Sequence, residues 1–374
     1  MTHILEPLLE DLDRQGLWPA LAAGYRGIEK ESLRFTPDGH LAYTPHPRAL
    51  GSPLTHPRIT TDFCEAQLEL ITEPSPSVEA CLAQLDEVHR FVYARLGEES
   101  LWAASMPCVL DGNDEIPLAR FGESNGGRAK TVYRSGLGYR YGRAMQTISG
   151  IHYNFSFSDP LWEWYRERRA PGTSLRDARS AGYFALIRNF RRHAWLLLYL
   201  FGASPALCHT FLGGRPTDLA RRGAGTLYRP RATTLRMGDL GYQSDAQRAL
   251  HVSYNGLDDY AGSLYGALTT PHPPYERIGT LVDGEWRQLS TSLLQIENEF
   301  YGTIRPKRSI MPGERPLHAL DERGVEYVEV RCLDVDPFLP LGIEATTLYF
   351  LDVFLTWCLL HESPEDSPEE SRAL

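Results

Sequence analysis

Pairs of carboxylates in strand-like segments are the features of this sequence most suited to chemistry. Glu29 and Glu31 stand two residues apart in RGIEKESLRF, and this spacing on a β-strand sends both side chains to one face. Two adjacent negative charges need compensation. Mg²⁺ supplies it, because it prefers hard oxygen ligands and bridges carboxylates to phosphate oxygens. The alternative is an E-x-E pair on a solvent-exposed strand face.

A second group of acids interrupts a mostly apolar segment. Asp62, Glu65 and Glu69 lie in ITTDFCEAQLELIT. The odd separation of Asp62 and Glu69 does not fit one flat strand, so a turn or a bulge must lie between them if both serve one site.

A third segment combines a histidine with an amide side chain. His152 and Asn154 in ISGIHYNF share one strand face, opposite Ile151, Tyr153 and Phe155. A histidine in this position is either a metal ligand or a structural histidine whose hydrogen bonds are satisfied.

The most regular alternation occurs in GVEYVEVRCLDVDPF. Tyr327, Glu329 and Arg331 occupy one strand face, and Val328 and Val330 occupy the other. An arginine two residues from a carboxylate suits a site in which the acid holds a metal and the guanidinium binds phosphate oxygens. A surface ion pair has the same spacing.

The common nucleotide loops and enzyme nucleophile motifs are missing from the sequence. G-x-x-x-x-G-K-[ST] does not occur, and GESNGGRAK at residues 122–130 imitates it only loosely. H-E-x-x-H and G-x-S-x-G are also absent. Covalent catalysis through Ser or Cys therefore has no support, and the carboxylates remain the candidates.

Strand-like segments must position these side chains, and we predict them at residues 25–35, 148–158, 225–236, 251–254, 289–300 and 325–335. Apolar residues at helical spacing predict helices over 78–96 and 180–200. Residues 5–23 predict two short helices broken by Gly16 and Pro19. Because strands do not alternate regularly with helices, the pattern predicts an α+β fold with a largely antiparallel sheet.

The chain is expected to divide into a helical segment at 1–24, a catalytic domain at 25–361 and an acidic tail at 362–374. Low hydrophobicity and high charge predict disorder for the tail. Residues 348–360 are apolar nearly all round. A helix without a polar face needs cover on every side, so we expect this fold, a second copy or a separate chain to bury it.

Charge and cysteine usage limit the partners of the chain. A net charge of −10 over 374 residues argues against nucleic-acid or anionic-membrane partners. The densest basic runs, 166–169 and 188–193, are interpreted as solvated helix faces. Six cysteines without C-x-x-C spacing indicate free thiols. With no secretory signal and no apolar run long enough to span a bilayer, we predict a soluble, cytoplasmic protein.

Taken together, these segments resemble the proteobacterial type of glutamate-cysteine ligase, in the glutamine synthetase-like superfamily. The resemblance runs from about residue 25 to about residue 360, and rests on ITTDF, YRSGLGYRYGRAMQTISGIHYNFS, AGYF, YLFGASPA, LGY, QIENEFY, IRPKR and EYVEVR in one order. Each motif alone is weak, whereas the ordered series is specific. It implies a funnel of mostly antiparallel strands flanked by helices, whose concave face binds magnesium, ATP and two amino acids.

The resemblance also implies roles for single residues. Arg331 would contact the transferring phosphoryl group, so that Arg331 and Glu329 form the catalytic pair. Arg134 and Arg236 would hold substrate carboxylates or phosphate. The metal, Mg²⁺ with Mn²⁺ as an alternative, would be held by Glu29, Glu31, Asp62, Glu69, His152 and Glu329. Cysteine would lie among Phe63, Tyr133, Gln146, Asn154, Tyr242 and Tyr301.

The implied reaction joins L-glutamate to L-cysteine at the expense of ATP through γ-glutamyl phosphate, the first step of glutathione biosynthesis. Members of this family continue well beyond the end of this chain, so the sequence is expected to be C-terminally shortened. Two alternatives stay open. The first is a related ATP-dependent carboxylate-amine ligase that uses another amine, and the second is an inactive, shortened relative.

Overall fold

A seven-stranded sheet forms the centre of the computed structural model, which describes residues 5–241, 245–248, 250–311 and 313–374. Its strands are Tyr25–Phe35 (β1), Ile59–Thr61 (β2), Gln67–Ile71 (β3), Ser100–Leu101 (β4), Ile151–Ser156 (β5), Ile304–Lys307 (β11) and Tyr327–Leu333 (β12). The order is β11-β12-β5-β1-β3-β2, with β4 paired to β1. Neighbouring strands run antiparallel throughout.

Two small sheets lie outside the central one. Ala206–Cys208 (β6), Ala220–Arg222 (β7) and Thr226–Tyr228 (β8) form a three-stranded sheet, and Leu281–Val282 (β9) pairs with Glu285–Trp286 (β10).

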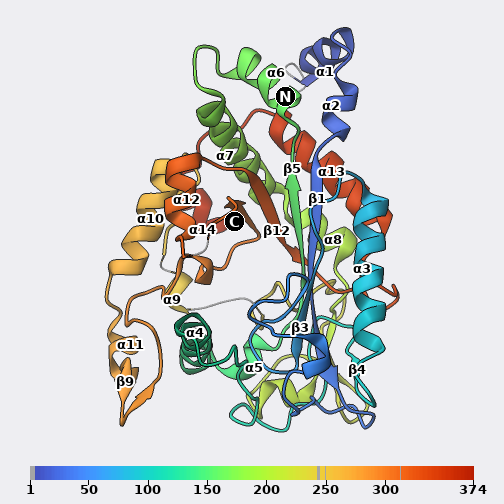
Figure 1. Ribbon diagram of the computed structural model, residues 1–374, viewed down its shortest axis with the longest axis vertical. Coiled ribbons are helices and arrows are strands. Elements are labelled where there is room, and N and C mark those ends of the chain that lie inside the picture. Colours follow the sequence, from blue (N-terminus) through green and yellow to red (C-terminus); the bar gives the residue numbers. More distant parts are fainter. Residues whose placement is uncertain (1–4, 242–244, 249, 312) are drawn as a thin grey trace.

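Helices flank the central sheet (Figure 1). The longer ones are Val78–Tyr93 (α3), Asn125–Tyr141 (α4), Asp159–Arg169 (α6), Leu175–His193 (α7), Leu257–Thr269 (α10) and Ala345–Leu360 (α13). The shorter ones are Leu5–Arg14 (α1), Trp18–Ala22 (α2), Arg143–Gln146 (α5), Trp195–Phe201 (α8), Asp245–Arg248 (α9), Pro273–Ile278 (α11), Pro316–Arg323 (α12) and Pro368–Ala373 (α14). Short 3₁₀ turns occur at Arg48–Leu50 (η1), His209–Leu212 (η2) and Glu297–Glu299 (η3).

One face of the sheet is covered by helices. α3 packs on β1 and β3, α8 packs on β12, and α13 packs against both α3 and α7. The strand side chains that point to this layer are the apolar ones: Ile151, Tyr153 and Phe155 of β5 are buried in the main core. The alternate positions of the same strand therefore face the other side of the sheet.

The apolar helix α13 is covered on its inner side by this fold. Leu351 and Leu355 are fully buried, whereas Tyr349 and Val353 are 50% and 70% exposed. Asp352 ties the helix to the sheet, because it accepts a hydrogen bond from Arg26 Nε at 2.7 Å. The sequence predicts that α13 is covered on every side, but its outer side is exposed in the structure. Among the described residues no helix is long and apolar enough to span a bilayer.

Several predicted strands are absent. Residues 251–254 and 289–300 form no strand, and in 225–236 only Thr226–Tyr228 does. In 289–300 side chains take the place of strand partners: Leu289 N donates to Gln295 Oε1 at 2.9 Å, and Gln295 N donates to Glu299 Oε2 at 2.6 Å. Residues 289–300, in which apolar and polar side chains nearly alternate, therefore form a loop that buried polar side chains stabilise.

The acidic tail, which the sequence predicts to be disordered, is ordered in the structure. It forms α14, and it lies against the basic run of α7: Arg191 Nη1 donates to Asp366 Oδ2 at 3.1 Å, and Arg192 Nε donates to Glu370 Oε1 at 2.6 Å. Arg188 of the same run is buried and donates to the carbonyl of Tyr254. The interpretation of 188–193 as a solvated face is thus wrong, because the acidic tail supplies its counter-charges. The boundaries 1–24, 25–361 and 362–374 stay a prediction.

Candidate active site

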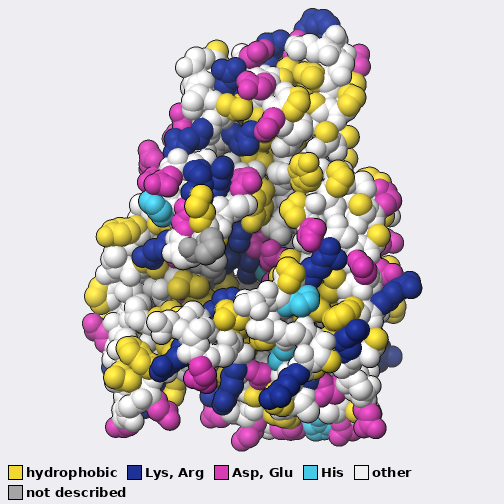
Figure 2. Space-filling model, in the orientation of Figure 1, with side chains coloured by type: hydrophobic (Ala, Val, Ile, Leu, Met, Phe, Trp, Pro, Cys, Tyr) yellow, Lys and Arg dark blue, Asp and Glu magenta, His cyan; other side chains and the backbone are white. Residues whose placement is uncertain are grey.

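The side of the sheet away from α3 and α13 holds a cavity of about 410 Å³. Figure 2 shows this face of the molecule hollowed near its centre, with acidic and basic side chains around the hollow. The cavity brings together most of the residues singled out in the sequence: Glu29, Glu31, Asp62, Phe63, Glu69, Tyr133, Arg134, Gln146, His152, Tyr301, Glu329 and Arg331.

Strand register places the carboxylates next to one another. Glu29 pairs with His152 across β1 and β5, and Glu31 pairs with Glu69 across β1 and β3. Opposite residues in an antiparallel pair have Cβ atoms about 4.5–5.5 Å apart. Residues far apart in the sequence therefore meet on one face as a direct result of the pairing.

A turn between β2 and β3 allows Asp62 and Glu69 to line one cavity despite their odd separation in the sequence. Asp62 N donates to Gln67 O and Gln67 N donates to Cys64 O, both at 2.9 Å. Glu65 inside this turn has another task. Its carboxylate accepts from His46 N at 2.5 Å and Arg120 N at 2.7 Å, so it holds two loops and does not line the cavity.

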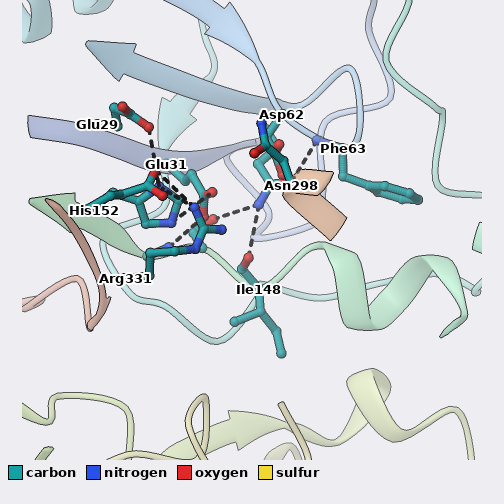
Figure 3. Close-up of polar contacts among 12 residues, drawn as sticks. Glu29, Glu31, Asp62, Phe63, Ile148, His152, Asn298 and Arg331 are labelled. Atoms are coloured by element: carbon teal, nitrogen blue, oxygen red, sulfur yellow. Dashed lines mark hydrogen bonds and ion pairs between the residues drawn. The ribbon is translucent and has the colours of Figure 1, made fainter. Parts of the chain in front are cut away.

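Glu29, His152 and Glu329 form a compact group whose ligand atoms all lie within 4.8 Å of one another. His152 Nδ1 lies 3.4 Å from Glu29 Oε2 and 3.8 Å from Glu329 Oε1. His152 Nε2 lies 3.9 Å from Glu31 Oε1. Figure 3 shows Glu29, Glu31, His152 and Arg331 gathered from neighbouring strands.

Two carboxyl groups of the cavity have raised pKa values. Burial raises the pKa of Glu31 to about 8, and the charge of Asp62 adds to the shift. The pKa of Glu69 lies well above its usual range because of burial and the nearby charges of Glu29 and Asp62. Burial and neighbouring negative charge therefore disfavour the ionised forms of these two acids, and a bound cation would favour them.

The groups around His152 are shifted the other way. Burial favours the protonated form of Glu329, but the charges of Lys307 and Arg331 outweigh it and hold its pKa well below the usual range. Burial also opposes the ionised form of Glu29, yet the hydrogen bond from His152 leaves its pKa lowered. Burial and Arg331 lower the pKa of His152. Its ring is then neutral at pH 7, the form that binds metals.

Arg331 lies at the centre of this group. Its Nη1 is 3.2 Å from Glu329 Oε1 and 3.4 Å from His152 Nδ1. Sequence reasoning missed two cations on the neighbouring edge strand β11, Arg305 and Lys307, which also line the cavity. Their two-residue spacing in IRPKR is the same signal that identified Glu329 and Arg331, and it places both on one strand face.

The predicted cysteine pocket is only partly assembled by the described residues. Gln146 Nε2 donates to Tyr301 Oη at 2.9 Å, and Phe63 and Tyr133 line the same cavity. Asn154 does not line it. Its Nδ2 donates to Glu29 Oε1 at 2.9 Å, and it lines a neighbouring cavity.

The two predicted substrate-binding arginines differ in their positions relative to the cavity. Arg134 lines the cavity, but its guanidinium is tied to the carbonyls of Asp62 and Lys130. Arg236 is 1% exposed and donates to the carbonyl of Arg331 at 2.9 Å. It lines an adjacent cavity of about 200 Å³ rather than the main one, since it packs beneath β12. Tyr242 lies outside the described residues.

A larger cavity of about 960 Å³ adjoins this one. Tyr141 lines it and contacts Tyr301 of the first cavity edge-on, with ring centroids 5.9 Å apart. None of the predicted site residues lies among its described lining residues. The smaller cavity, and not the larger one, therefore contains the predicted catalytic and metal-binding residues.

Sequence comparison gives a consistent set of relatives. The family model described as glutamate-cysteine ligase matches residues 9–374. A glutamate-cysteine ligase of Alcanivorax borkumensis is 57% identical over 350 residues, which cover 92% of this chain and 67% of that protein. One from Pseudomonas aeruginosa is 55% identical over 364 residues, covering 97% of this chain and 69% of the relative. This chain is thus shorter than the relatives it matches.

Solved structures give the same result for the fold. A glutamate-cysteine ligase of Francisella tularensis in complex with AMP matches with a TM-score of 0.88 at 42% identity, covering 94% of this chain and 70% of that one. A bifunctional glutathione synthetase from Pasteurella multocida matches with a TM-score of 0.78 at 29% identity, covering 97% and 43%. The predicted α+β fold with a large antiparallel sheet flanked by helices is confirmed.

Proposed function

This chain belongs to the glutamate-cysteine ligase family and is an ATP-dependent glutamate-cysteine ligase of glutathione biosynthesis, and from that premise we propose which of its residues carry each part of the reaction. The observation that carries the proposal is the convergence of carboxylates, one histidine and several cations on a single cavity. Phosphoryl transfer needs this combination, since its catalysis consists of positioning and charge neutralisation.

The residues around His152 fit a divalent cation. His152 Nε2 and Glu329 Oε2 are buried and have no hydrogen-bond partner among the described residues. Buried polar atoms normally have a partner, so these two are available to bind an ion. Carboxylate oxygens suit Mg²⁺ and Mn²⁺. We assign the ion or ions to Glu29, Glu31, Asp62, Glu69, His152 and Glu329. When bound, magnesium would neutralise the negative charge of the phosphate groups.

The chemistry needs no enzyme nucleophile. The γ-carboxylate of glutamate attacks the γ-phosphorus of ATP, which releases ADP and leaves γ-glutamyl phosphate. The cysteine amine then attacks the acyl carbon, and phosphate leaves. The N–H groups of the planar Arg331 guanidinium donate hydrogen bonds to the phosphoryl oxygens while charge shifts onto the ADP oxygen. Its place 3.2 Å from Glu329 supports this role.

Substrate selection is assigned to the aromatic and amide side chains of the cavity. Phe63, Tyr133, Gln146 and Tyr301 would surround the cysteine side chain, with Tyr242 as a further candidate, while Asn154 supports Glu29. Arg134 is proposed to hold a substrate carboxylate or phosphate, and Arg236, which lines the adjacent cavity, is a further candidate for this role. We expect 2-aminobutyrate to remain a measurable substrate, because one methyl-sized difference costs only about 1–3 kcal/mol.

The cellular context is part of the proposal. L-glutamate, L-cysteine and ATP are the partners that the site requires, and no nucleic acid or membrane is invoked. A cytoplasmic location is supported by the six cysteines, which are all free thiols, the usual state in a reducing compartment.

An ADP-release assay with the purified chain, Mg²⁺, ATP, glutamate and a panel of amine acceptors tests the function. We expect ADP release that requires both glutamate and cysteine. Efficient turnover with another amine and refusal of cysteine would identify the related carboxylate-amine ligase. Binding of ATP without any turnover would identify the inactive, shortened relative.

A further inference from the structure

The side chain of Lys307 differs from every other cation on the wall of the active cavity. It extends from the end of β11, the edge strand of the sheet, and its Nζ lies 3.6 Å from Glu329 Oε1. Glu329 is the only charged partner within ion-pair distance among the described residues. Lys307 also lines a second, adjoining cavity of about 150 Å³, so its ammonium has room on both sides.

Two arginines on the wall are more firmly held than Lys307 by hydrogen bonds to backbone carbonyls. Arg305 Nη2 donates to the carbonyls of Asn298 and Phe300. Arg134 is tied to backbone carbonyls in the same way. Lys130 turns toward the ring of Phe121, at 5.2 Å from its centroid.

Glu329 is shared by too many cations to keep all of them once it binds a metal. Its Oε1 lies 3.2 Å from Arg331 and 3.6 Å from Lys307, and its Oε2 lies 3.8 Å from Arg305. A carboxylate that donates electron pairs to a metal interacts less with neighbouring cations. Lys307 has a flexible four-carbon stem and few restraints, so it is the cation most able to follow a new anion.

We propose that Lys307 leaves Glu329 when MgATP enters and binds the β- and γ-phosphate oxygens, so that it fixes the polyphosphate in the ground state. This inference rests on the proposed metal role of Glu329. The Nζ of Lys307 lies 3.6 Å from Glu329 Oε1, so a phosphate group that reached a metal held by Glu329 would come near this ammonium. Lys307 and Arg331 then divide the work: Lys307 contributes to nucleotide affinity, and Arg331 contributes to the rate of phosphoryl transfer.

Calorimetric titration with the magnesium complex of the non-hydrolysable β,γ-imido analogue of ATP tests this assignment. Lys307→Gln should raise the Kd by about 10- to 100-fold, as expected for a lost charge-assisted contact. Lys307→Arg should recover most of the affinity. AMP, which lacks both phosphates, should bind the wild type and the variant with Kd values within about twofold of each other.

Arg308→Gln is the matched control. Arg308 follows Lys307 directly and its side chain is 24% exposed, against 23% for Lys307, but it pairs with Glu326. The Kd of the Arg308→Gln variant for the ATP analogue should stay within about twofold of the wild-type value. Equal losses in both variants, or unchanged affinity in a folded Lys307→Gln, would overturn the inference alone. Failure of the wild type to bind the analogue would instead overturn the proposed function.

Discussion

The neutral ring of His152 shows how single residues define this site. Cross-strand pairing holds it beside Glu29, and its Nδ1 faces Glu29, Glu329 and the guanidinium of Arg331 within 3.4 to 3.8 Å. A lone histidine in the sequence has two interpretations, metal ligand or structural group. Its buried Nε2 has no hydrogen-bond partner in the part of the chain that the structure describes, which favours the first, because a structural histidine normally satisfies both ring nitrogens.

Arg331→Lys should reduce turnover far more than it weakens amino-acid binding. A planar guanidinium that contacts the phosphoryl group in the transition state is poorly replaced by a point charge. We expect kcat to fall by about two to four orders of magnitude, in line with arginine fingers, while the KM for glutamate changes little. Steady-state kinetics with each substrate varied in turn measures this split. Unchanged turnover would leave Arg331 as an ordinary ion pair.

His89 should make stability depend on pH in mildly acidic solution. Burial lowers its pKa from 6.5 to about 3, and the nearby charge of Lys30 adds to the shift. Because the unfolded state binds this proton more readily, the stabilisation is complete above pH 6.5 and is lost as the pH falls toward 3. The slope is about 1.4 kcal/mol per pH unit.

The replacement His89→Gln tests this contribution in urea unfolding between pH 7 and pH 5. The free energy of unfolding of the variant should fall less steeply with acid than that of the wild type. His318→Gln, at an exposed position on α12, serves as the control and should keep the wild-type slope. Identical slopes for all three proteins would show that His89 is not the responsible group.

At the scale of elements, the glycines of the segment 122–130 start a helix rather than a phosphate loop. α4 begins at Asn125, and Ser124 caps it by accepting a hydrogen bond from Gly127 N at 3.1 Å. A Cβ on Gly127 would lie 2.4 Å from the carbonyl oxygen of Phe121, whereas one on Gly126 would meet nothing within 4 Å. The loose likeness to a nucleotide loop thus has a packing explanation.

The two neighbouring glycines give a matched pair of substitutions. Gly127→Ala should destabilise the protein by about 1–3 kcal/mol, because the clash involves backbone that only a shift of the chain relieves. Gly126→Ala should be neutral or stabilising by up to about 1 kcal/mol, since alanine is the better helix former. Chemical denaturation of both variants measures the difference. Equal stabilities would show that α4 can move away from residues 121–122.

In the whole molecule, α13 and the C-terminal segment that follows it pack against α7, and α13 also contacts α3. α13 is held through Asp352 to β1, and α14 follows it, lying near the middle of the molecule in Figure 1. The outer face of α13 stays exposed at Tyr349 and Val353. The helix therefore has one face that must stay apolar and another that tolerates charge.

The double variant Leu351→Glu with Phe354→Glu should fail to fold. Leu351 is fully buried and Phe354 is 6% exposed, and an unpaired buried carboxylate costs about 3–5 kcal/mol, so two such charges approach a typical total stability of about 5–15 kcal/mol. Val353→Glu on the exposed face should fold normally. Thermal unfolding and light scattering distinguish these results, and a stable, monomeric double variant would show that α13 needs no cover.

Much of the site could be predicted from the sequence because strand periodicity is local. Two-residue spacing fixed the shared faces of Glu29 with Glu31 and of Glu329 with Arg331. The alternation of apolar residues in β5 and β12 showed which face meets the core. The ordered motifs identified the family, and the family comparison confirmed it.

Features that depend on partners distant in the sequence could be seen only in the folded structure. The tail is ordered because Arg191 and Arg192, some 175 residues away, neutralise it, and composition alone carries no information on such a match. Residues 289–300 form a loop because buried side chains satisfy their backbone. Asn154 supports Glu29 instead of lining the cavity, since strand register sets its position. Local pattern thus determines which face a side chain takes, while long-range packing determines what it meets there.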